Sequence, residues 1–378
     1  MTGLVGRFAS KPFVHRDLKT AALPWVVARV FVLGSLWMSR FLADHLPSGG
    51  RTRFPAEGLF TYDGYWYRAI AEHGYLALPK EGLRFFPLYP LLGRGLGAVF
   101  ADHTGVALVV IANLAALLMG AVLHRLVLHE TKDPQLALRS AWFVAVFPAA
   151  LGLVLAYAES LLMLAAVGMF LALRKQRWIP AAALGVAAGL VRPVGILLVV
   201  PAAIEAARAW STTAVRERAS RLTAVAAPAV GTGAYLAWVW AEYDDPLLPF
   251  SVQNRHGLRG GSVDPFSHVI DSIGDLLDGS RFGAGMHLVW IAVFLVLIAV
   301  LARRFPASYT AYSGVTLLLG LTADNISSFD RYVFSSFPFV LGIAILTARR
   351  THERLGIALA SGGLVIYAIL AFFHLYVP

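Results

Sequence analysis

Long apolar runs follow one another along the chain, separated by short breaks that contain charged residues, proline or glycine. Such runs are typical of helices that cross a membrane, which need about 20 apolar residues for one span. Some runs are shorter, and short or interrupted spans are tolerated where protein or a polar cavity covers the backbone. We predict eleven membrane segments, at 24–46, 105–128, 136–156, 158–173, 178–190, 193–209, 221–241, 285–302, 306–322, 333–348 and 354–377.

The composition of the chain leads to the same class. Hydrophobic residues make up 58% and charged residues 14% of the 378 residues, whereas soluble domains are about 25% charged. A chain this apolar would expose large apolar patches in water. The composition therefore excludes soluble globular, disordered and fibrous proteins, and the predicted fold class is an all-α polytopic membrane protein. Because the chain has no cysteine, it holds no disulfide and no thiolate metal site.

The distribution of charge predicts the orientation. The chain carries a formal charge of +10, and its basic residues gather in short connections such as 174–177, 303–304 and 349–350. Cytoplasmic connections of membrane proteins carry such an excess of Lys and Arg. We expect a cytoplasmic N-terminus, a retained first helix and basic inner connections. The excess of positive charge is then expected at the cytoplasmic ends of the helices, and we predict no nucleic-acid partner.

The predicted organisation is one transmembrane domain over 1–378 with two long outer loops. The first outer loop runs over 47–104 and the second over 242–285. The inner connections are short and leave no room for a soluble catalytic domain. Any chemistry is therefore expected at the outer membrane face, on loops and helix ends.

The first outer loop has the most unusual local sequence, with four aromatic residues crowded around Asp63. The pattern from Gly64 to His73 predicts a short amphipathic helix that lies on the membrane, with Asp63 at its N-cap. Two interpretations of Asp63 stay open: a structural N-cap, or a general base beside an aromatic platform for a sugar. A second interfacial or re-entrant helix is predicted around the prolines Pro87 and Pro90.

Several motifs, taken in order, resemble the PIG-V family, which contains the second GPI mannosyltransferase of eukaryotes and bacterial relatives. They are Asp63-x3-Tyr67-x2-Ile70-Ala71-Glu72-His73-Gly74-Tyr75, Phe85-Phe86-Pro87-x2-Pro90, Tyr157-Ala158-Glu159-Ser160, Gly189-Leu190-Val191-Arg192-Pro193-x-Gly195, Pro246-Leu247-x2-Phe250-x2-Gln253 and Asp330-Arg331-Tyr332-x2-Ser335-Ser336-x-Pro338. The chain departs from the family at Tyr62, where the family commonly has Trp, and at His256-Gly257, where it often has Trp-Gly. The second departure bears on the choice of acceptor.

The resemblance implies a GT-C glycosyltransferase fold with the active site between the first outer loop and the helix bundle. It also implies inverting transfer of mannose from polyprenyl-phosphate mannose to a lipid-linked or glycan acceptor. In an inverting transfer one carboxylate suffices as the base, and Asp63 is our first candidate. Glu159 is the second candidate, with the alternative that it is a structural partner of Arg192 or Arg331.

A lipid phosphate as leaving group predicts cations at the outer face. Arg331 and Arg192 are the candidates, because arginine binds phosphate through two parallel hydrogen bonds. The alternative is that both side chains extend to lipid headgroups. The candidate substrate-binding residues are Tyr62, Trp66, Tyr67, His73, Tyr157 and Gln253. His73 could equally be a packed interfacial histidine.

No metal or other cofactor is predicted, because the outer acids show no metal-ligand spacing. These acids include Asp244, Asp245, Asp271, Asp275 and Asp278. The expected partners are the lipid-linked donor, the acceptor and membrane lipids. A transporter or flippase of lipid-linked sugars is the alternative from another class, and a scaffold protein the third. The expected location is the plasma membrane with an extracytoplasmic site, or the endoplasmic reticulum membrane in a eukaryote.

Overall fold

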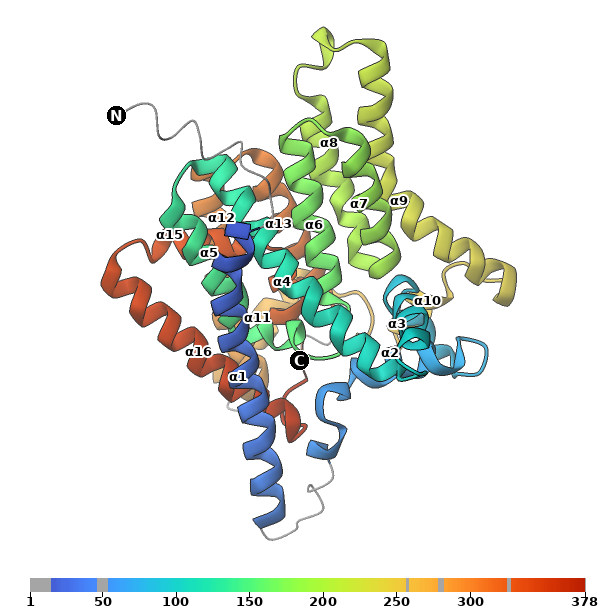
Figure 1. Cartoon of the computed structure of the whole chain (residues 1–378), viewed down its shortest axis with the longest axis vertical. Coiled ribbons are helices and arrows are strands. Elements are labelled where there is room, and N and C mark those ends of the chain that lie inside the picture. Colours follow the sequence, from blue (N-terminus) through green and yellow to red (C-terminus); the bar gives the residue numbers. More distant parts are fainter. Residues whose placement is uncertain (1–14, 46–53, 256–257, 278–281, 325–327, 378) are drawn as a thin grey trace.

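The computed structural model describes residues 15–45, 54–255, 258–277, 282–324 and 328–377 (Figure 1). Regular structure in this part of the chain is helical, apart from an isolated β-bridge between Ser262 and Ala323. The α-helices are α1 (His15–His45), α2 (Asp63–His73), α3 (Leu88–Val99), α4 (Thr104–Thr131), α5 (Pro134–Val146), α6 (Glu159–Arg174), α7 (Trp178–Val191), α8 (Val199–Ala207), α9 (Val215–Tyr243), α10 (Leu248–Gln253), α11 (Pro265–Leu277), α12 (Phe282–Arg304), α13 (Ala307–Leu321), α14 (Phe329–Phe334), α15 (Pro338–Leu346) and α16 (Arg350–Phe372). The 3-10 helices are η1 (Phe54–Phe60), η2 (Lys80–Arg84), η3 (Pro148–Leu153), η4 (Pro193–Leu198) and η5 (Trp210–Thr212).

The prediction that the chain is all-α is confirmed for the described residues, and every predicted apolar segment overlaps one helix or a pair of helices. The observed helix boundaries differ from the predicted segment boundaries at several prolines. Helix α1 begins at His15 and contains Pro24, so it starts nine residues before the predicted segment. By contrast, Pro148 and Pro338 do interrupt predicted segments, since α5 ends at Val146 and α15 starts anew at Pro338.

Four helices in the described part are long and apolar enough to cross a membrane, by length and composition: α1, α4, α9 and α16. Shorter apolar stretches run over Trp178–Val191 and Pro193–Ala207. These helices define a helical membrane protein, while the count of eleven spans stays a prediction. The loop predicted over 47–104 carries η1, α2, η2 and α3, although its first residues, 47–53, lie outside the described part.

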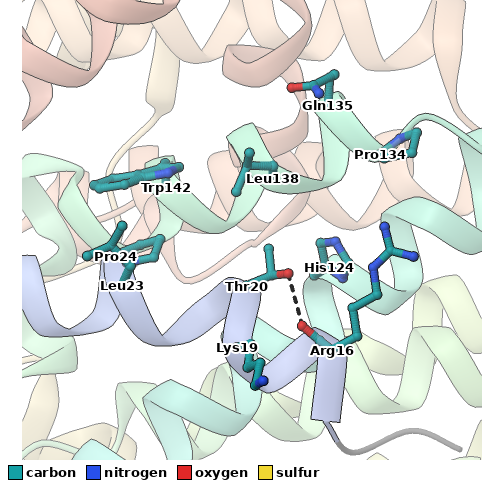
Figure 2. A pocket seen from close by; sticks show the side chains of 10 residues that line it. All are labelled: Arg16, Lys19, Thr20, Leu23, Pro24, His124, Pro134, Gln135, Leu138 and Trp142. Carbon is teal, nitrogen blue, oxygen red and sulfur yellow. Dashed lines mark hydrogen bonds between the residues drawn. The ribbon is translucent and has the colours of Figure 1, made fainter.

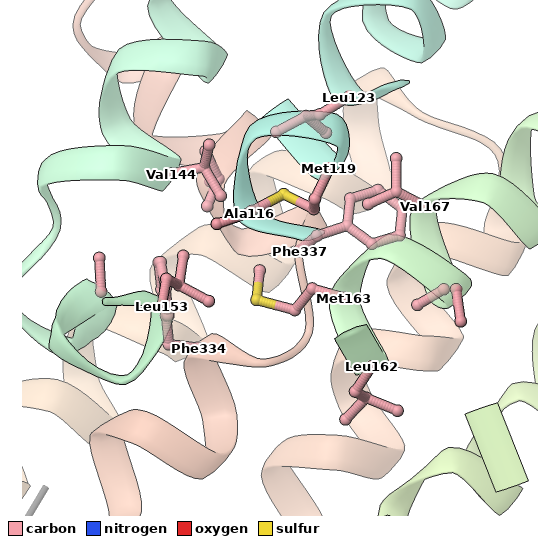
Figure 3. Close-up of a cluster of buried hydrophobic side chains, with 14 of the residues drawn as sticks. Ala116, Met119, Leu123, Val144, Leu153, Leu162, Met163, Val167, Phe334 and Phe337 are labelled. Carbon is pink, nitrogen blue, oxygen red and sulfur yellow. The ribbon is translucent and has the colours of Figure 1, made fainter. Parts of the chain in front are cut away.

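The hydrophobic core lies where α4, α5, α6 and the α14–α15 connection meet (Figure 3). Met163 on α6 is fully buried there, beside Met119 of α4 and Phe337 from the α14–α15 connection. Phe147 stacks on Phe334 at a centroid distance of 4.8 Å, which joins the end of α5 to α14. This core therefore fixes α6 and α14 relative to each other, and both helices carry charged residues of the candidate site.

Helices α7 and α9 lie side by side (Figure 1) and approach closely through glycine. A Cβ on Gly189 would sit 2.2 Å from the carbonyl oxygen of Pro228, and one on Gly231 would sit 2.2 Å from that of Val186. Small residues permit such close helix crossings in membrane proteins. Just beyond this contact Arg192 is extended (φ −154°) and Pro193 begins η4. The motif around Gly189 thus places Arg192 at the end of a tightly held helix.

The chain end folds back on the first outer loop. Helix α16 packs beside α1 (Figure 1), and the residues after it reach the start of α2. His374 stacks on Tyr62 at 4.4 Å and its Nε2 lies 3.1 Å from Thr61 Oγ1. The Tyr376 hydroxyl donates to both carboxylate oxygens of Asp330, each at 2.9 Å. The tail therefore joins the Asp63 loop to α14.

Candidate functional site

Four charged side chains meet at the ends of four helices. Asp63 is the first residue of α2 and Glu159 the first of α6, while Arg192 follows α7 and Arg331 lies in α14. Arg331 Nη1 donates to Asp63 Oδ2 at 2.9 Å and lies 3.2 Å from Glu159 Oε1. Arg192 Nη1 donates to the same Glu159 oxygen. The four residues form a charge-balanced chain of two carboxylates and two guanidinium groups, called here the charged cluster.

The members of the charged cluster differ in exposure. The side chains of Glu159 and Arg331 are each 4% exposed and that of Arg192 is 9% exposed, whereas Asp63 is 22% exposed. Among the described residues, Glu159 Oε2 and Arg331 Nε are buried without a hydrogen-bond partner. Asp63 is therefore the most exposed member of the charged cluster, and the buried part retains unused hydrogen-bonding capacity.

Aromatic rings enclose the guanidinium groups. The Arg331 guanidinium lies 5.1 Å from the ring centre of Tyr157 and 5.2 Å from that of Tyr332. Arg192 lies 5.4 Å from the same Tyr332 ring. Cation–π contacts of this kind hold a guanidinium in place without using its N–H donors. The donors therefore stay available to the carboxylates, or to an anion that replaces one of them.

Backbone contacts fasten the Asp63 loop to the segment before α6. The Ala156 amide donates to the Leu59 carbonyl at 2.9 Å, and the Tyr157 hydroxyl donates to the Thr61 carbonyl at 3.1 Å. A Cβ on Gly64 would lie 3.6 Å from the Ala156 carbonyl oxygen, so the start of α2 is in contact with this segment. These contacts explain why Asp63 and Glu159, far apart in sequence, share one arginine.

The prediction that Asp63 is an N-cap is wrong. Helix α2 begins at Asp63, and Tyr62 occupies the cap position with φ +52° and no side-chain capping bond. The Asp63 carboxylate instead accepts from Arg331, because a buried guanidinium is a stronger partner than a backbone amide. The predicted end of the helix at His73 is confirmed.

Tyr62 has a backbone conformation that is unusual for an aromatic residue. The stack on His374 and a hydrogen bond from its hydroxyl to the Tyr376 carbonyl, at 3.1 Å, hold it there. Burial, with a contribution from Glu57, raises the pKa of Tyr62 to about 12. Its hydroxyl is therefore a neutral donor near neutral pH. Strained residues held by many contacts are common at functional sites.

The other aromatic candidates pack against Arg331 or against neighbouring rings. Tyr67 and Tyr157 are buried, with 2% and 0% exposure. Tyr67 packs edge-on against Phe85 at 5.0 Å, and Trp66 stacks on the same ring at 5.9 Å. Contact of Tyr67 or Tyr157 with a substrate would require the site to open, so their substrate-binding role stays a prediction.

His73 lies away from the charged cluster, and Gln253 contacts a different part of the first outer loop. His73 is exposed at the far end of α2, about 15 Å along the helix axis from Asp63 at a rise of 1.5 Å per residue. Gln253 Oε1 accepts from Arg84 Nη1 at 3.3 Å, which ties α10 to the first outer loop. Roles for both in substrate binding stay predictions. His256-Gly257 and Asp278 lie outside the described residues.

The sequence interpretation missed three residues around the site. Tyr332 stands beside Arg331 in a motif that drew attention only to its charged members, yet its ring touches both guanidinium groups. His374 and Tyr376 contact the Asp63 loop across more than 300 positions of sequence. A signal for Tyr332 was present in that motif, whereas the local sequence of the tail carries none.

An open hollow of about 430 Å³ lies beside the start of α2, between α1 and the first outer loop. Its charged lining consists of Arg40, Arg68 and Glu57, and its apolar lining includes Leu36 and Phe60. The Arg68 guanidinium lies 5.3 Å from the Phe60 ring centre. In the described part of the chain, no group of three or more His, Cys, Asp or Glu side chains is placed to hold a metal ion.

Fold and site together define a helical membrane protein with a buried charged cluster at one end of its bundle. No protein-family model matches the sequence, and no curated protein matches it. Among solved structures the chain is similar to the archaeal oligosaccharyltransferase of Archaeoglobus fulgidus, in the apo form and, as AglB, in complex with an inhibitory peptide and a dolichol-phosphate. Each match covers 96% of this chain with a TM-score of 0.45 and 12% identity. This chain spans 56% of the length of that protein.

Proposed function

We propose that this protein is a membrane glycosyltransferase with the charged cluster as its active site. It transfers a hexose, with mannose as the first candidate, from a polyprenyl-phosphate donor to a lipid-linked or glycan acceptor, with inversion at the anomeric carbon. The observation that carries this proposal is the ion pair between Asp63 and Arg331, in which a partly exposed carboxylate contacts a buried guanidinium group. A second buried guanidinium, that of Arg192, lies close by. The order of motifs that resembles the PIG-V family supports the choice of donor.

The chemistry needs a base on one face of the sugar and positive charge on the other. Asp63 accepts the proton of the acceptor hydroxyl as its oxygen bonds to the anomeric carbon. The bond from that carbon to the phosphate oxygen breaks, and the phosphate leaves with the electron pair. Positive charge near this oxygen stabilises the developing negative charge. Arg331 supplies it, and Arg192 supports Arg331 through the Glu159 carboxylate that both contact.

The carboxylates of the charged cluster neutralise both arginines. A donor phosphate that binds Arg331 therefore competes with Asp63 for the same amino group, Nη1. We propose that this exchange frees the Asp63 carboxylate as the donor arrives. Glu159 is nearly buried and contacts both arginines, so we assign it a positioning role, in accord with the structural alternative considered for it.

The hollow between α1 and the first outer loop offers a place for the lipid-linked substrate. It combines two guanidinium groups, Arg40 and Arg68, and the carboxylate of Glu57 with an apolar lining. A phosphate on a hydrocarbon chain requires both cationic and apolar contacts. The hollow includes Tyr65, two residues beyond Asp63. We propose an extracytoplasmic site in the plasma membrane, as the basic connections at the opposite end favour.

A transfer assay with purified protein in vesicles tests the proposal. Labelled polyprenyl-phosphate mannose and polyprenyl-phosphate glucose are supplied separately with a mixture of lipid and glycan acceptors. We expect transfer by the wild type and a loss of about 100-fold or more in Asp63→Asn. Glu81→Gln is the matched control, because Glu81 lies in the same outer loop and pairs with exposed Arg255 at 2.5 Å. The proposal fails if the wild type moves labelled lipid across the bilayer but forms no product, since that is the behaviour of a flippase.

A further inference from the structure

A second pocket lies at the opposite end of the bundle, between the first turns of α1, the last turns of α4 and the start of α5. Its volume is about 320 Å³. Its lining combines basic, polar and apolar side chains, drawn in Figure 2: Arg16, Lys19, Thr20, Leu23, Pro24, His124, Pro134, Gln135, Leu138 and Trp142. The basic connections lie at this end of the helix bundle, so we expect it to face the cytoplasm.

The lining changes from polar to apolar in one direction along both walls. On α1, Arg16 and Lys19 come first and Leu23 follows one turn later. On α5, Gln135 precedes Trp142 by two turns. Figure 2 shows Arg16, His124 and Pro134 at one end of the pocket, with Leu23, Pro24 and Trp142 at the other. This order matches a lipid, whose charged headgroup passes into a hydrocarbon chain.

Two acidic residues adjoin the pocket: Asp133, whose carboxylate caps α5 by accepting from backbone amides, and Asp17 on α1. Asp17 is 2% exposed and accepts from Arg125 Nε at 2.9 Å, and its other oxygen lies 2.6 Å from His124 Nδ1. The charge of Asp17 is therefore compensated by residues of α4 within the contact between α1 and α4. Arg16 and Lys19 are exposed, and their two positive charges at the mouth of the pocket exceed the single negative charge of Asp133.

We propose that this pocket binds the phosphate headgroup of an anionic membrane phospholipid, with one acyl chain running along Leu23, Leu138 and Trp142. Basic pockets between membrane helices on the cytoplasmic side recognise anionic headgroups. A volume of about 320 Å³ holds a glycerol phosphate and the first part of a chain, and the open side of the pocket leaves the remainder in the bilayer. The bound lipid would join α1, α4 and α5 at the end opposite the charged cluster.

Native mass spectrometry of the purified full chain tests this site. The protein is delipidated in detergent and mixed with phosphatidylglycerol or with phosphatidylcholine of the same acyl chains. We expect one retained phosphatidylglycerol and a clear preference over phosphatidylcholine. In Arg16→Gln/Lys19→Gln the affinity should fall by roughly five-fold for each cation removed. The matched control is Arg303→Gln/Arg304→Gln, which removes two exposed cations from another inner connection and should keep wild-type affinity.

A second variant separates the pocket from general surface charge. Leu138→Trp fills the pocket without changing charge and should also abolish retention of the lipid, while far-ultraviolet circular dichroism confirms that the variant is folded. The inference is overturned if both lipids bind equally, if the two double variants lose affinity alike, or if Leu138→Trp retains the lipid. It is also overturned if glycerol phosphate without acyl chains competes as well as the lipid does.

Discussion

The guanidinium of Arg331 and the carboxylate of Asp63 are joined at 2.9 Å across 268 positions of sequence. The same amino group also lies 3.2 Å from Glu159, so one nitrogen bridges two acids that begin different helices. This contact brings the first outer loop, the start of α6 and α14 to a single point. Changes at the charged cluster should therefore affect both stability and catalysis, and the two effects can be separated.

Replacement of Arg331 should distinguish charge from shape. Arg331→Gln leaves the buried Glu159 with Arg192 as its remaining cation and should lower the free energy of unfolding by about 3–5 kcal/mol. Arg331→Lys keeps one charged nitrogen and should lose less, although it gives up the stacking with Tyr157 and Tyr332. Reversible unfolding in mixed micelles measures both values. Equal losses in the two variants would show that the charge is not what the site requires.

Neutralisation of Asp63 should mainly reduce transfer activity, whereas neutralisation of Glu159 should mainly reduce the free energy of unfolding. Asp63→Asn keeps an oxygen acceptor for Arg331 at a partly exposed position, so it should cost little stability while it removes most transfer activity. Glu159→Gln leaves two buried guanidinium groups short of a charge and should cost about 3–5 kcal/mol. Unfolding and transfer are measured on the same preparations, with Glu81→Gln as control. If Asp63→Asn were the more destabilising variant, Asp63 would be the structural carboxylate.

The sequence was sufficient to find the members of the charged cluster but not their pairing. A charge at the end of an apolar segment is energetically costly unless it is paired or binds a ligand. This argument identifies Glu159, Arg192 and Arg331. Which arginine meets which acid depends on how helices pack, and Glu159 in fact contacts both. The local pattern at Asp63 predicted an N-cap, but a cation from α14 provided a stronger partner.

Helix interruptions show the same limit for the fold. Hydropathy located the apolar segments, yet Pro24 lies inside a continuous helix whereas Pro148 opens a separate one. Both prolines are buried, so burial does not separate the two cases. Pro148 lies in the buried segment that leads to Glu159, and Pro24 packs within α1 beside the pocket between α1 and α5. Hydropathy carries no information on either environment.

Removal of the Tyr376 hydroxyl should increase the local opening of α14 and of the start of α2 without changing a residue of the charged cluster. Tyr376→Phe takes two hydrogen bonds from Asp330, whose side chain is fully buried. A buried acceptor left without its partner costs about 1–3 kcal/mol. Hydrogen–deuterium exchange should therefore accelerate in α14 and at the start of α2. Tyr65→Phe is the control, since Tyr65 is exposed and should leave exchange in α14 unchanged. Unaltered exchange in Tyr376→Phe would mean that the tail does not brace the site.

Two glycines in α9 offer a matched test of how Arg192 is positioned. A Cβ on Gly231 would meet the Val186 carbonyl oxygen at 2.2 Å, whereas one on Gly233 would have nothing within 4 Å. Gly231→Ala should therefore force α7 and α9 apart and destabilise the protein by about 1–3 kcal/mol. Gly233→Ala should be neutral or stabilise it by up to about 1 kcal/mol, because alanine favours the helix over glycine.

The same pair of variants connects the helix crossing to catalysis. Arg192 follows directly after α7, so a shift of that helix moves its guanidinium away from Glu159 and weakens the support of Arg331. Transfer in Gly231→Ala should fall at temperatures where the variant is still folded, while Gly233→Ala keeps wild-type transfer. Thermal unfolding and initial transfer rates measured together check this. Full activity in folded Gly231→Ala would show that the charged cluster tolerates displacement of α7, and Arg192 would then have no positioning role.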